Sequence, residues 1–156
     1  IMPLISYNYA SKNIKRMKHA TGFSIKISVS FMTASLLIFH FGADLLVSLF
    51  MKNETIIAYG CQFLGGLSLA LPFLSLDFLA VGIFTACGMG RKTLVFALLR
   101  KIILEIPALF ILDKLFPLYG LAYAQFTAEL ILSAIGMIVL IRLFRNLENK
   151  AGSISQ

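Results

Sequence analysis

Three acidic side chains lie inside long apolar stretches of this sequence. Asp77 belongs to the stretch ALPFLSLDFLAVGIFTACGMG (residues 70–90), and Glu105 and Glu129 belong to two later ones. A charge at the centre of a lipid bilayer costs at least about 2.5 kcal/mol, so a carboxylate there is either protonated or holding a cation. A group that alternates between these forms is what ion-coupled transport needs. The three acids are candidates for that chemistry, with Asp77 as the Na⁺ ligand if the cation is Na⁺.

Four apolar stretches would hold these acids in place. Each is long enough for a helix that crosses a hydrocarbon core about 30 Å thick, which takes about 20 residues. The stretches cover residues 23–43, 56–87, 94–112 and 118–141. At 1.5 Å per helical residue, each acid lies about 15 to 16 Å from one end of its own span. Three acids from three helices are therefore expected at one level, near the middle of the membrane.

Two prolines fall inside the expected spans. Pro72 and Pro107 each remove one backbone hydrogen bond from a helix. Such a proline either kinks its helix or is simply tolerated, as prolines often are in membrane helices, and both alternatives stay open. The segment LLVSLFM (45–51) is expected to form a short interfacial helix before the second span.

The composition is that of an integral membrane protein. Hydrophobic residues make up 59% of the 156 residues and charged residues 13%, whereas a soluble domain carries about 25% charged residues. The net charge of +7 does not indicate nucleic-acid binding, because the basic residues form short clusters between apolar runs. We therefore expect an all-α integral membrane fold with no nucleic-acid partner.

No group of residues resembles an enzyme site. His19 and His40 have no Cys or carboxylate at metal-ligand spacing, and we find no Gly-rich phosphate loop and no nucleophile elbow. Cys61 and Cys87 fall about 39 Å apart on one expected helix, too far for a disulfide. We expect neither enzyme activity nor a cofactor.

Lysine and arginine residues predict the orientation in the membrane. Of fourteen such residues, Lys52 and Lys114 fall on one side of the four spans, and the other twelve fall on the opposite side. The twelve are Lys12, Lys15, Arg16, Lys18, Lys26, Arg91, Lys92, Arg100, Lys101, Arg142, Arg145 and Lys150. Because such residues concentrate on the cytoplasmic side, both termini are expected in the cytoplasm, with the spans in the cell membrane. Arg100 and Lys101 are expected to reach back to the cytoplasmic headgroups.

Two aromatic residues accompany Asp77 on one helical face. Phe73 lies one turn before the carboxylate and Phe84 two turns after it. Rings on both sides of a carboxylate would suit a lipophilic cation, although Phe is also common in any membrane helix. Phe73 and Phe84 are therefore candidates for a substrate cavity.

The other two acids have neighbours that allow a structural use. Gln125 shares a polar, small-residue face with Glu129, which is expected of an ion site or of an interhelical hydrogen-bond network. Gln125 is thus a further cavity candidate. Glu105 lies one turn from Lys101, which offers it an ion-pair partner. Asp77 has no such partner nearby in the sequence, and this makes it the strongest candidate for cation coupling.

Several segments resemble the multidrug and toxic compound extrusion (MATE) transporters. The first, PLISYNYASKNIKRMK (3–18), is similar to the segment that follows the eighth of their twelve helices, with Ala10 where the family usually has Gly. The second, LPFLSLDFLAVGIFTACGMGRKTLVFALLRKIILEIPALFIL (71–112), resembles the tenth helix, a short G-x-G-[RK]-K-T turn and the eleventh helix. The third, LFPLYGLAYAQFTAE (115–129), resembles the entry to the twelfth.

The resemblance implies that the chain is the C-terminal part of such a transporter, covering about helices 9 to 12. Residues 1–22 would be the end of helix 8 and a cytoplasmic loop, and residues 142–156 a cytoplasmic tail. The start, IMPLISYNYASKN, has no signal-peptide pattern and is expected to be a cut within a longer protein. The remaining lobe of the transporter and membrane lipid would be its partners.

The implied activity is export of cationic, lipophilic drugs in exchange for inward H⁺ or Na⁺. In family members of the NorM type an acid in the tenth helix takes part in coupling, and Asp77 resembles the occupant of that place. One alternative is a lipid or oligosaccharide flippase of the same architecture, which would need cationic groups for phosphate. Another is a membrane scaffold in which the three acids only tie helices together.

Overall fold

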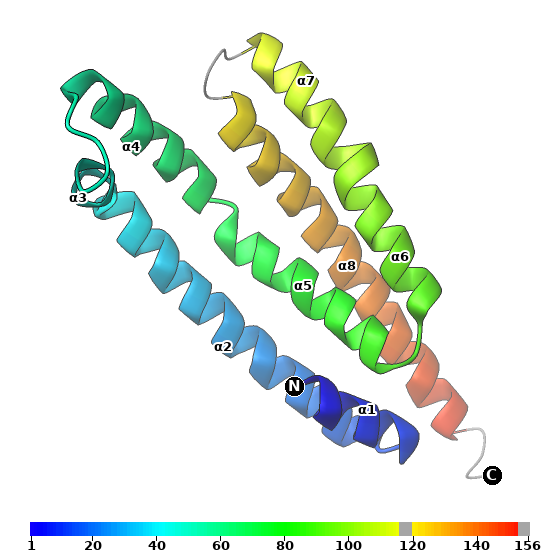
Figure 1. Cartoon of the computed structure of the whole chain (residues 1–156). Coiled ribbons are helices and arrows are strands. Elements are labelled where there is room, and N and C mark those ends of the chain that lie inside the picture. The colour runs from blue at the N-terminus through cyan, green and yellow to red at the C-terminus, as the bar shows by residue number, and fades with distance from the viewer. Residues whose placement is uncertain (116–119, 153–156) are drawn as a thin grey trace.

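In the computed structural model, residues 1–115 and 120–152 are described, and every element within these ranges is a helix. Figure 1 shows an elongated arrangement of helices that run roughly along one direction. The elements are α1 (Met2–Ala10), α2 (Ile14–Phe41), α3 (Ala43–Ser48), α4 (Glu54–Ser68), α5 (Leu71–Ala86), α6 (Gly90–Leu98), the π-helix η1 (Leu99–Glu105), α7 (Ile106–Leu115) and α8 (Gly120–Gly152). The expectation of an all-α membrane fold is confirmed.

The first long helix, α2, begins well before the expected residue 23. Its start is fixed by Asn13, whose side chain accepts a hydrogen bond of 3.1 Å from the Arg16 backbone N–H. This N-cap satisfies one of the backbone donors that a helix start leaves without a partner. Lys12, at φ 55°, turns the chain from α1 into α2. The helix therefore extends past the apolar segment into the basic one.

The expected second span is not one helix but two. α4 and α5 are separated at Leu69 and Ala70 and are bent by 41° relative to each other. Pro72 stands in the first turn of α5, where its missing N–H costs no hydrogen bond. Of the two alternatives for this proline, the kink is confirmed. The short helix α3, just ahead of α4, overlaps the expected interfacial segment 45–51.

Helices α6, η1 and α7 follow one another without a gap and cover the expected third span. The middle piece, η1, is a seven-residue π-helix that ends two residues before Pro107. By length and composition α2 and α8 can each cross a membrane, and the bent α4–α5 pair adds a third span if it is counted as one. Four crossings remain a prediction.

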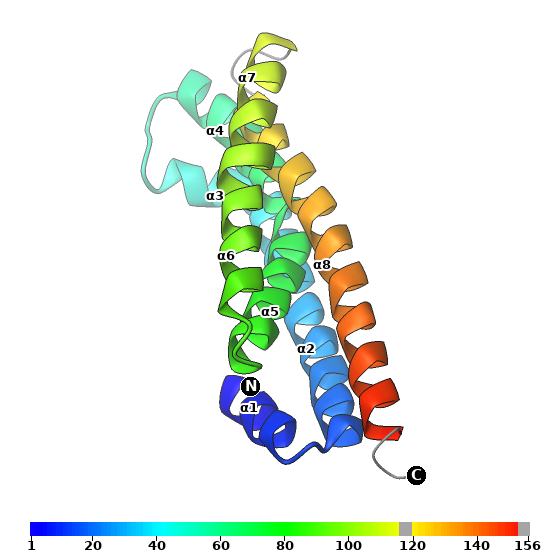
Figure 2. The same ribbon diagram turned by 90° about the vertical axis from the view of Figure 1, so that its right-hand side faces the viewer.

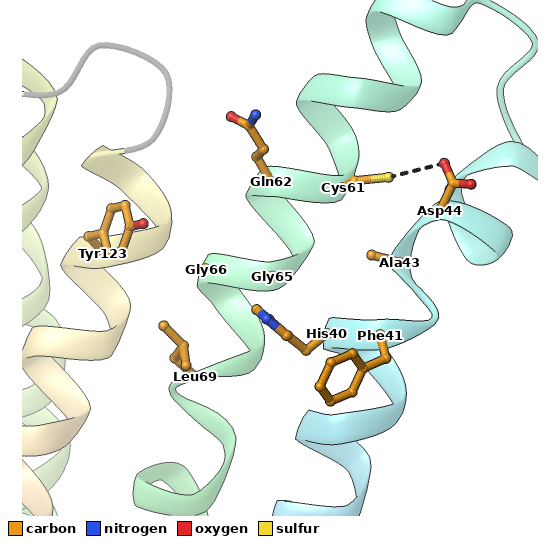
Figure 3. Close-up of a pocket in the computed structure, with 10 residues that line it drawn as sticks. All are labelled: His40, Phe41, Ala43, Asp44, Cys61, Gln62, Gly65, Gly66, Leu69 and Tyr123. Atoms are coloured by element: carbon orange, nitrogen blue, oxygen red, sulfur yellow. Dashed lines mark hydrogen bonds between the residues drawn. The ribbon is translucent and has the colours of Figure 1, made fainter.

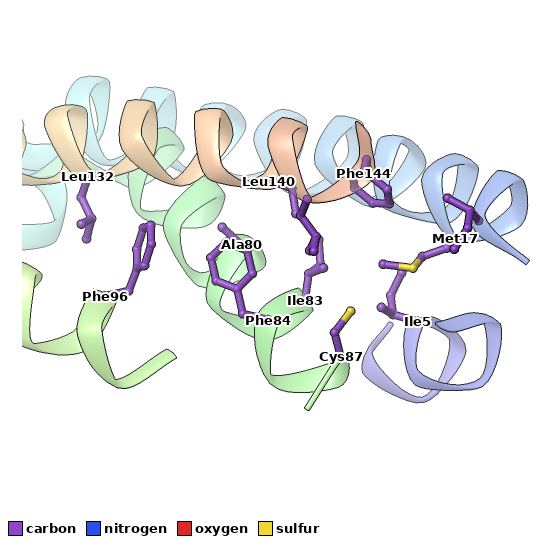
Figure 4. Close-up of a cluster of buried hydrophobic side chains, with 12 residues drawn as sticks. Ile5, Met17, Ala80, Ile83, Phe84, Cys87, Phe96, Leu132, Leu140 and Phe144 are labelled. Atoms are coloured by element: carbon purple, nitrogen blue, oxygen red, sulfur yellow. The ribbon is translucent and has the colours of Figure 1, made fainter. Parts of the chain in front are cut away.

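Helix α5 lies at the centre of the packing, in contact with α1, α2, α6 and α8. A cluster of buried hydrophobic side chains fills the space between these helices (Figure 4). The hydroxyl of Ser6 in α1 donates a hydrogen bond of 2.9 Å to the Ala86 carbonyl at the end of α5. Because η1 and α5 both pack against α8, the three elements that carry the candidate acids are neighbours.

The chain reverses direction so that its first helix and the end of α8 lie at one end of the structure (Figure 2). Figure 2 shows α1, the turn between α5 and α6 and the last turns of α8 at the same end, with α3 and the start of α4 at the other. At the first end α2 and α8 are joined by an ion pair of 3.0 Å between Lys18 and Glu148.

Candidate functional site

One arginine joins two of the three candidate acids inside the helix bundle. Nη2 of Arg100 lies 2.8 Å from Oε1 of Glu129, and Nη1 lies 3.5 Å from Oδ2 of Asp77. Asp77 comes from α5, Arg100 from η1 and Glu129 from α8. We refer to these three residues as the acid–arginine cluster. Two carboxylates thus share one guanidinium, and the contact with Glu129 is the shorter.

The acid–arginine cluster is buried by the surrounding helices. Asp77 and Glu129 are each 1% exposed, and the Arg100 side chain is 18% exposed. The Arg100 guanidinium carbon also lies 4.7 Å from the centroid of the Phe78 ring, a distance at which a cation is attracted to an aromatic face. Buried charges of this kind are tolerated only when they are paired.

The pairing inside the acid–arginine cluster is incomplete. Within residues 1–115 and 120–149, Asp77 Oδ1, Glu129 Oε2 and Arg100 Nε are buried and have no hydrogen-bond partner. With both carboxylates ionised, one arginine leaves the cluster with a net charge of −1. A bound H⁺ or a hard cation such as Na⁺ would neutralise it, and carboxylate oxygens suit such cations. The arrangement is therefore suited to taking up one further positive charge.

Two expectations about these residues were wrong. Arg100 does not reach back to the headgroups, and Asp77 does have a basic partner, because the arginine turns inward between the two acids. An inward guanidinium that meets two carboxylates avoids leaving them unpaired in the apolar interior. The π-helix, which takes more residues per turn than an α-helix, carries Arg100 at its second position. The available sequence signal was Arg100 itself, a basic residue that lies next to Lys101 inside the otherwise apolar stretch LVFALLRKIILEIPALF.

Glu105 stays outside the acid–arginine cluster. Lys101 Nζ lies 2.7 Å from Glu105 Oε1, so the expected ion pair one helical turn apart is confirmed. The Lys101 side chain is 65% exposed, which places this pair at the surface of the helix bundle.

The aromatic candidates are not gathered around the carboxylate. The Phe73 ring meets Phe126 edge to face at a centroid distance of 5.7 Å. Phe84 is fully buried in the hydrophobic cluster of Figure 4, where its ring meets Phe96 at 5.4 Å. Gln125 is half-buried on α8. Their role in a substrate cavity remains a prediction.

A separate pocket of about 820 Å³ lies between α2, α3, α4 and the start of α8, toward the end of the structure opposite to α1 (Figure 3). It is lined by His40, Phe41, Ala43, Asp44, Cys61, Gln62, Gly65, Gly66, Leu69 and Tyr123. Cys61 points toward Asp44, with 3.9 Å between Sγ and Oδ1. Phe73, Phe84 and Gln125 do not line this pocket. In the described part of the chain, no group of three or more His, Cys, Asp or Glu residues could hold a metal ion.

Comparison with known proteins places the chain in a family. Residues 1–111 match the MatE family model. The multidrug export protein MepA of Staphylococcus aureus (strain MRSA252) is 31% identical over 140 residues, which is 89% of this chain and 30% of that protein. MepA of Staphylococcus saprophyticus is 27% identical over 139 residues, with the same two shares. No solved structure matches the chain.

The chain spans about 30% of the length of the curated relatives it matches. The family model covers more than half of the chain, and the long apolar helices α2 and α8 agree with a multi-pass membrane protein. The predicted resemblance is confirmed: this chain belongs to the MatE family, the multidrug and toxic compound extrusion transporters.

Proposed function

We propose that this chain is part of a multidrug efflux antiporter that exports lipophilic cationic compounds in exchange for H⁺ or Na⁺. The relatives that cover 89% of the chain are named multidrug export proteins, which supports export of this kind. The observation that carries the coupling step is the single buried guanidinium shared by Asp77 and Glu129. The protein would act in the cell membrane, with both ends of the chain in the cytoplasm.

In this proposal the acid–arginine cluster alternates between two charge balances. When the coupling cation is absent, the Arg100 guanidinium is shared between the two carboxylates. When H⁺ or Na⁺ binds, one carboxylate is neutralised and Arg100 pairs fully with the other. Because α5, η1 and α8 each supply one member, the change in pairing biases the arrangement of these three helices. A cationic drug that competes for the same negative charge would couple its export to cation entry.

A purely structural role is the second candidate. The same ion pairs tie α5, η1 and α8 together, and a scaffold would need nothing more. The two candidates differ in what happens when the charge on Asp77 is removed without loss of its shape. If the role is structural, the protein loses stability when the charge is removed. If the role is coupling, efflux no longer responds to the cation gradient.

The test is Asp77→Asn in a transporter that carries this chain at the full length of its relatives. We expect normal insertion and a loss of cation-driven efflux of a cationic dye by about 100-fold, because the asparagine no longer binds and releases a cation. Efflux is measured in reconstituted vesicles as the imposed H⁺ or Na⁺ gradient is varied.

Glu105→Gln is the matched control, since it removes an acid of similar depth that already pairs with Lys101 at the surface. It should leave the cation response near wild type. Glu129→Gln should flatten the response as Asp77→Asn does. An unchanged response in Asp77→Asn would overturn the proposal and leave the structural role.

A further inference from the structure

A basic groove runs along the first three turns of α2, beside the last turns of α8. Its volume is about 450 Å³, which is within the range of small-ligand pockets. The residues that line it are Lys15, Lys18, His19, Gly22, Phe23, Lys26 and Glu148. All except Glu148 come from α2, and each has another member of the set three or four residues away, so they form one face of that helix. We call this feature the basic groove.

The charge of the basic groove is unbalanced. Glu148 of α8 forms an ion pair with Lys18, with 3.0 Å between Glu148 Oε1 and Lys18 Nζ. Lys15 and Lys26 form no ion pair with any residue in 1–115 and 120–149. Two lysines thus remain available to an anion, one at each end of the groove.

The floor of the basic groove leaves room for a ligand. Gly22 lies between the two available lysines, and a Cβ atom built on it would meet no other atom within 4 Å. The space above this glycine is therefore open, and an anionic group can approach the helix backbone there.

An exposed apolar row continues from the basic groove along α2. Phe23, Ile27 and Phe31 are spaced four residues apart and are 61%, 53% and 67% exposed. After Lys26 the helix has no charged side chain through Phe41. α2 is about 42 Å long at 1.5 Å per residue, longer than a hydrocarbon core of about 30 Å. The lysines thus fall at headgroup level and the apolar row at acyl-chain level.

We infer that the basic groove binds the phosphate headgroup of an anionic phospholipid, whose acyl chain lies along Phe23, Ile27 and Phe31. The charge pattern selects the ligand, because a zwitterionic headgroup also brings a positive group toward the lysines. Basic pockets beside membrane helices are a known type of anionic-lipid site. The inference does not depend on the transport activity, since it concerns residues outside the acid–arginine cluster.

The test measures lipid binding to the purified 156-residue chain by native mass spectrometry, with phosphatidylglycerol and phosphatidylcholine titrated separately. We expect tighter binding of phosphatidylglycerol. The double variant Lys15→Gln/Lys26→Gln should weaken phosphatidylglycerol binding about tenfold or more, since each basic residue near an anionic surface contributes about 1 kcal/mol to the binding free energy. The control Arg142→Gln/Arg145→Gln removes the same charge from exposed positions on α8 that do not line the groove, and should change binding less than about twofold.

Two further variants separate a built site from general attraction. Glu148→Gln should strengthen phosphatidylglycerol binding because it frees Lys18. Gly22→Leu should abolish the binding by filling the floor, while circular dichroism shows the helix content retained. Equal losses in both double variants, or equal binding of the two lipids, would overturn the inference. Competition by inorganic phosphate at concentrations similar to the lipid would also overturn it, by pointing to a soluble anion.

Discussion

At the scale of single residues, Arg100 joins the most partners in the acid–arginine cluster. Its guanidinium pairs with two buried carboxylates and also lies over the face of the Phe78 ring. Arginine suits this position because its planar head carries five donors that can reach different partners. Lysine, a compact point charge, cannot form the same set of contacts. The unequal distances of 2.8 Å and 3.5 Å indicate that Glu129 is its main partner.

Arg100→Gln should reveal how much the two acids depend on this residue. Removing one partner of a buried ion pair costs about 3–5 kcal/mol because it leaves an uncompensated charge. Added Na⁺ or lower pH should then stabilise the variant more than the wild type, since either supplies the missing positive charge. The measurement is unfolding in mixed micelles at several pH and Na⁺ values.

Lys101→Gln is the neighbouring control, because it removes an exposed ion pair that contributes at most about 1 kcal/mol to the free energy of unfolding. If Arg100→Gln destabilised the chain no more than this control, the acid–arginine cluster would not be the energetic centre inferred from its geometry.

The acids themselves could be predicted from the sequence, but their partner could not. An acid within an apolar stretch is visible directly, and counting residues gives its depth along a helix. Depth does not say toward which neighbour a side chain turns. The direction in which the Arg100 side chain points depends on the π-helix and on the packing of η1 against α8. Neither of these has a clear sequence signature.

At the scale of helices, α4 and α8 approach each other closely at Gly66. A Cβ atom built on this residue would lie 3.0 Å from the Cβ atom of Ala122, which is itself buried. Small residues at such a crossing allow two helices to pack tightly in a membrane. The contact holds α4, the first half of the bent α4–α5 pair, against α8.

Gly66→Leu should therefore destabilise the chain by about 1–3 kcal/mol, as overpacking does. Gly22→Leu is a matched control on another helix, because nothing lies within 4 Å of its Cβ position. It should be neutral or stabilising by up to about 1 kcal/mol, since glycine is a poor helix former. Unfolding of both variants in mixed micelles checks the difference, and equal losses would contradict the close contact.

The helices were predictable where the apolar runs are long, but their ends were not. Four apolar runs, between 19 and 32 residues long, indicated the helical segments, and one or more helices cover most of each. The start of α2 depends on the Asn13 cap, which lies outside the apolar run. The break between α4 and α5 depends on Pro72, for which a straight helix was an equal alternative.

At the scale of the whole molecule, the basic residues gather at one end. The turn between α1 and α2, the start of α6 and the last turns of α8 lie at one end in Figure 2, and the sequence puts Lys12, Arg91 and Arg145 in these segments. The loop between α3 and α4 and the end of α7, which contain Lys52 and Lys114, lie toward the opposite end. The helix directions thus agree with the orientation that the distribution of charge predicts. The side of the membrane that this end faces remains a proposal.

Single cysteines introduced at Lys52 and Arg91 provide the test, in a background without Cys61 and Cys87. A membrane-impermeant thiol reagent added to intact cells should label position 52 and not position 91, because the positive end stays in the cytoplasm. Permeabilised cells should show both labelled. Labelling of both positions in intact cells would contradict the proposed topology.

The order of residues along the chain also sets the order in which the acid–arginine cluster is made. During synthesis α5 brings Asp77 into the membrane first, η1 follows with Arg100, and α8 brings Glu129 last. An arginine that enters the apolar phase alone would meet a cost of several kcal/mol, but a carboxylate is already there to receive it. Asp77 would act as the temporary counter-ion during insertion, before Glu129 arrives and takes the closer contact of 2.8 Å.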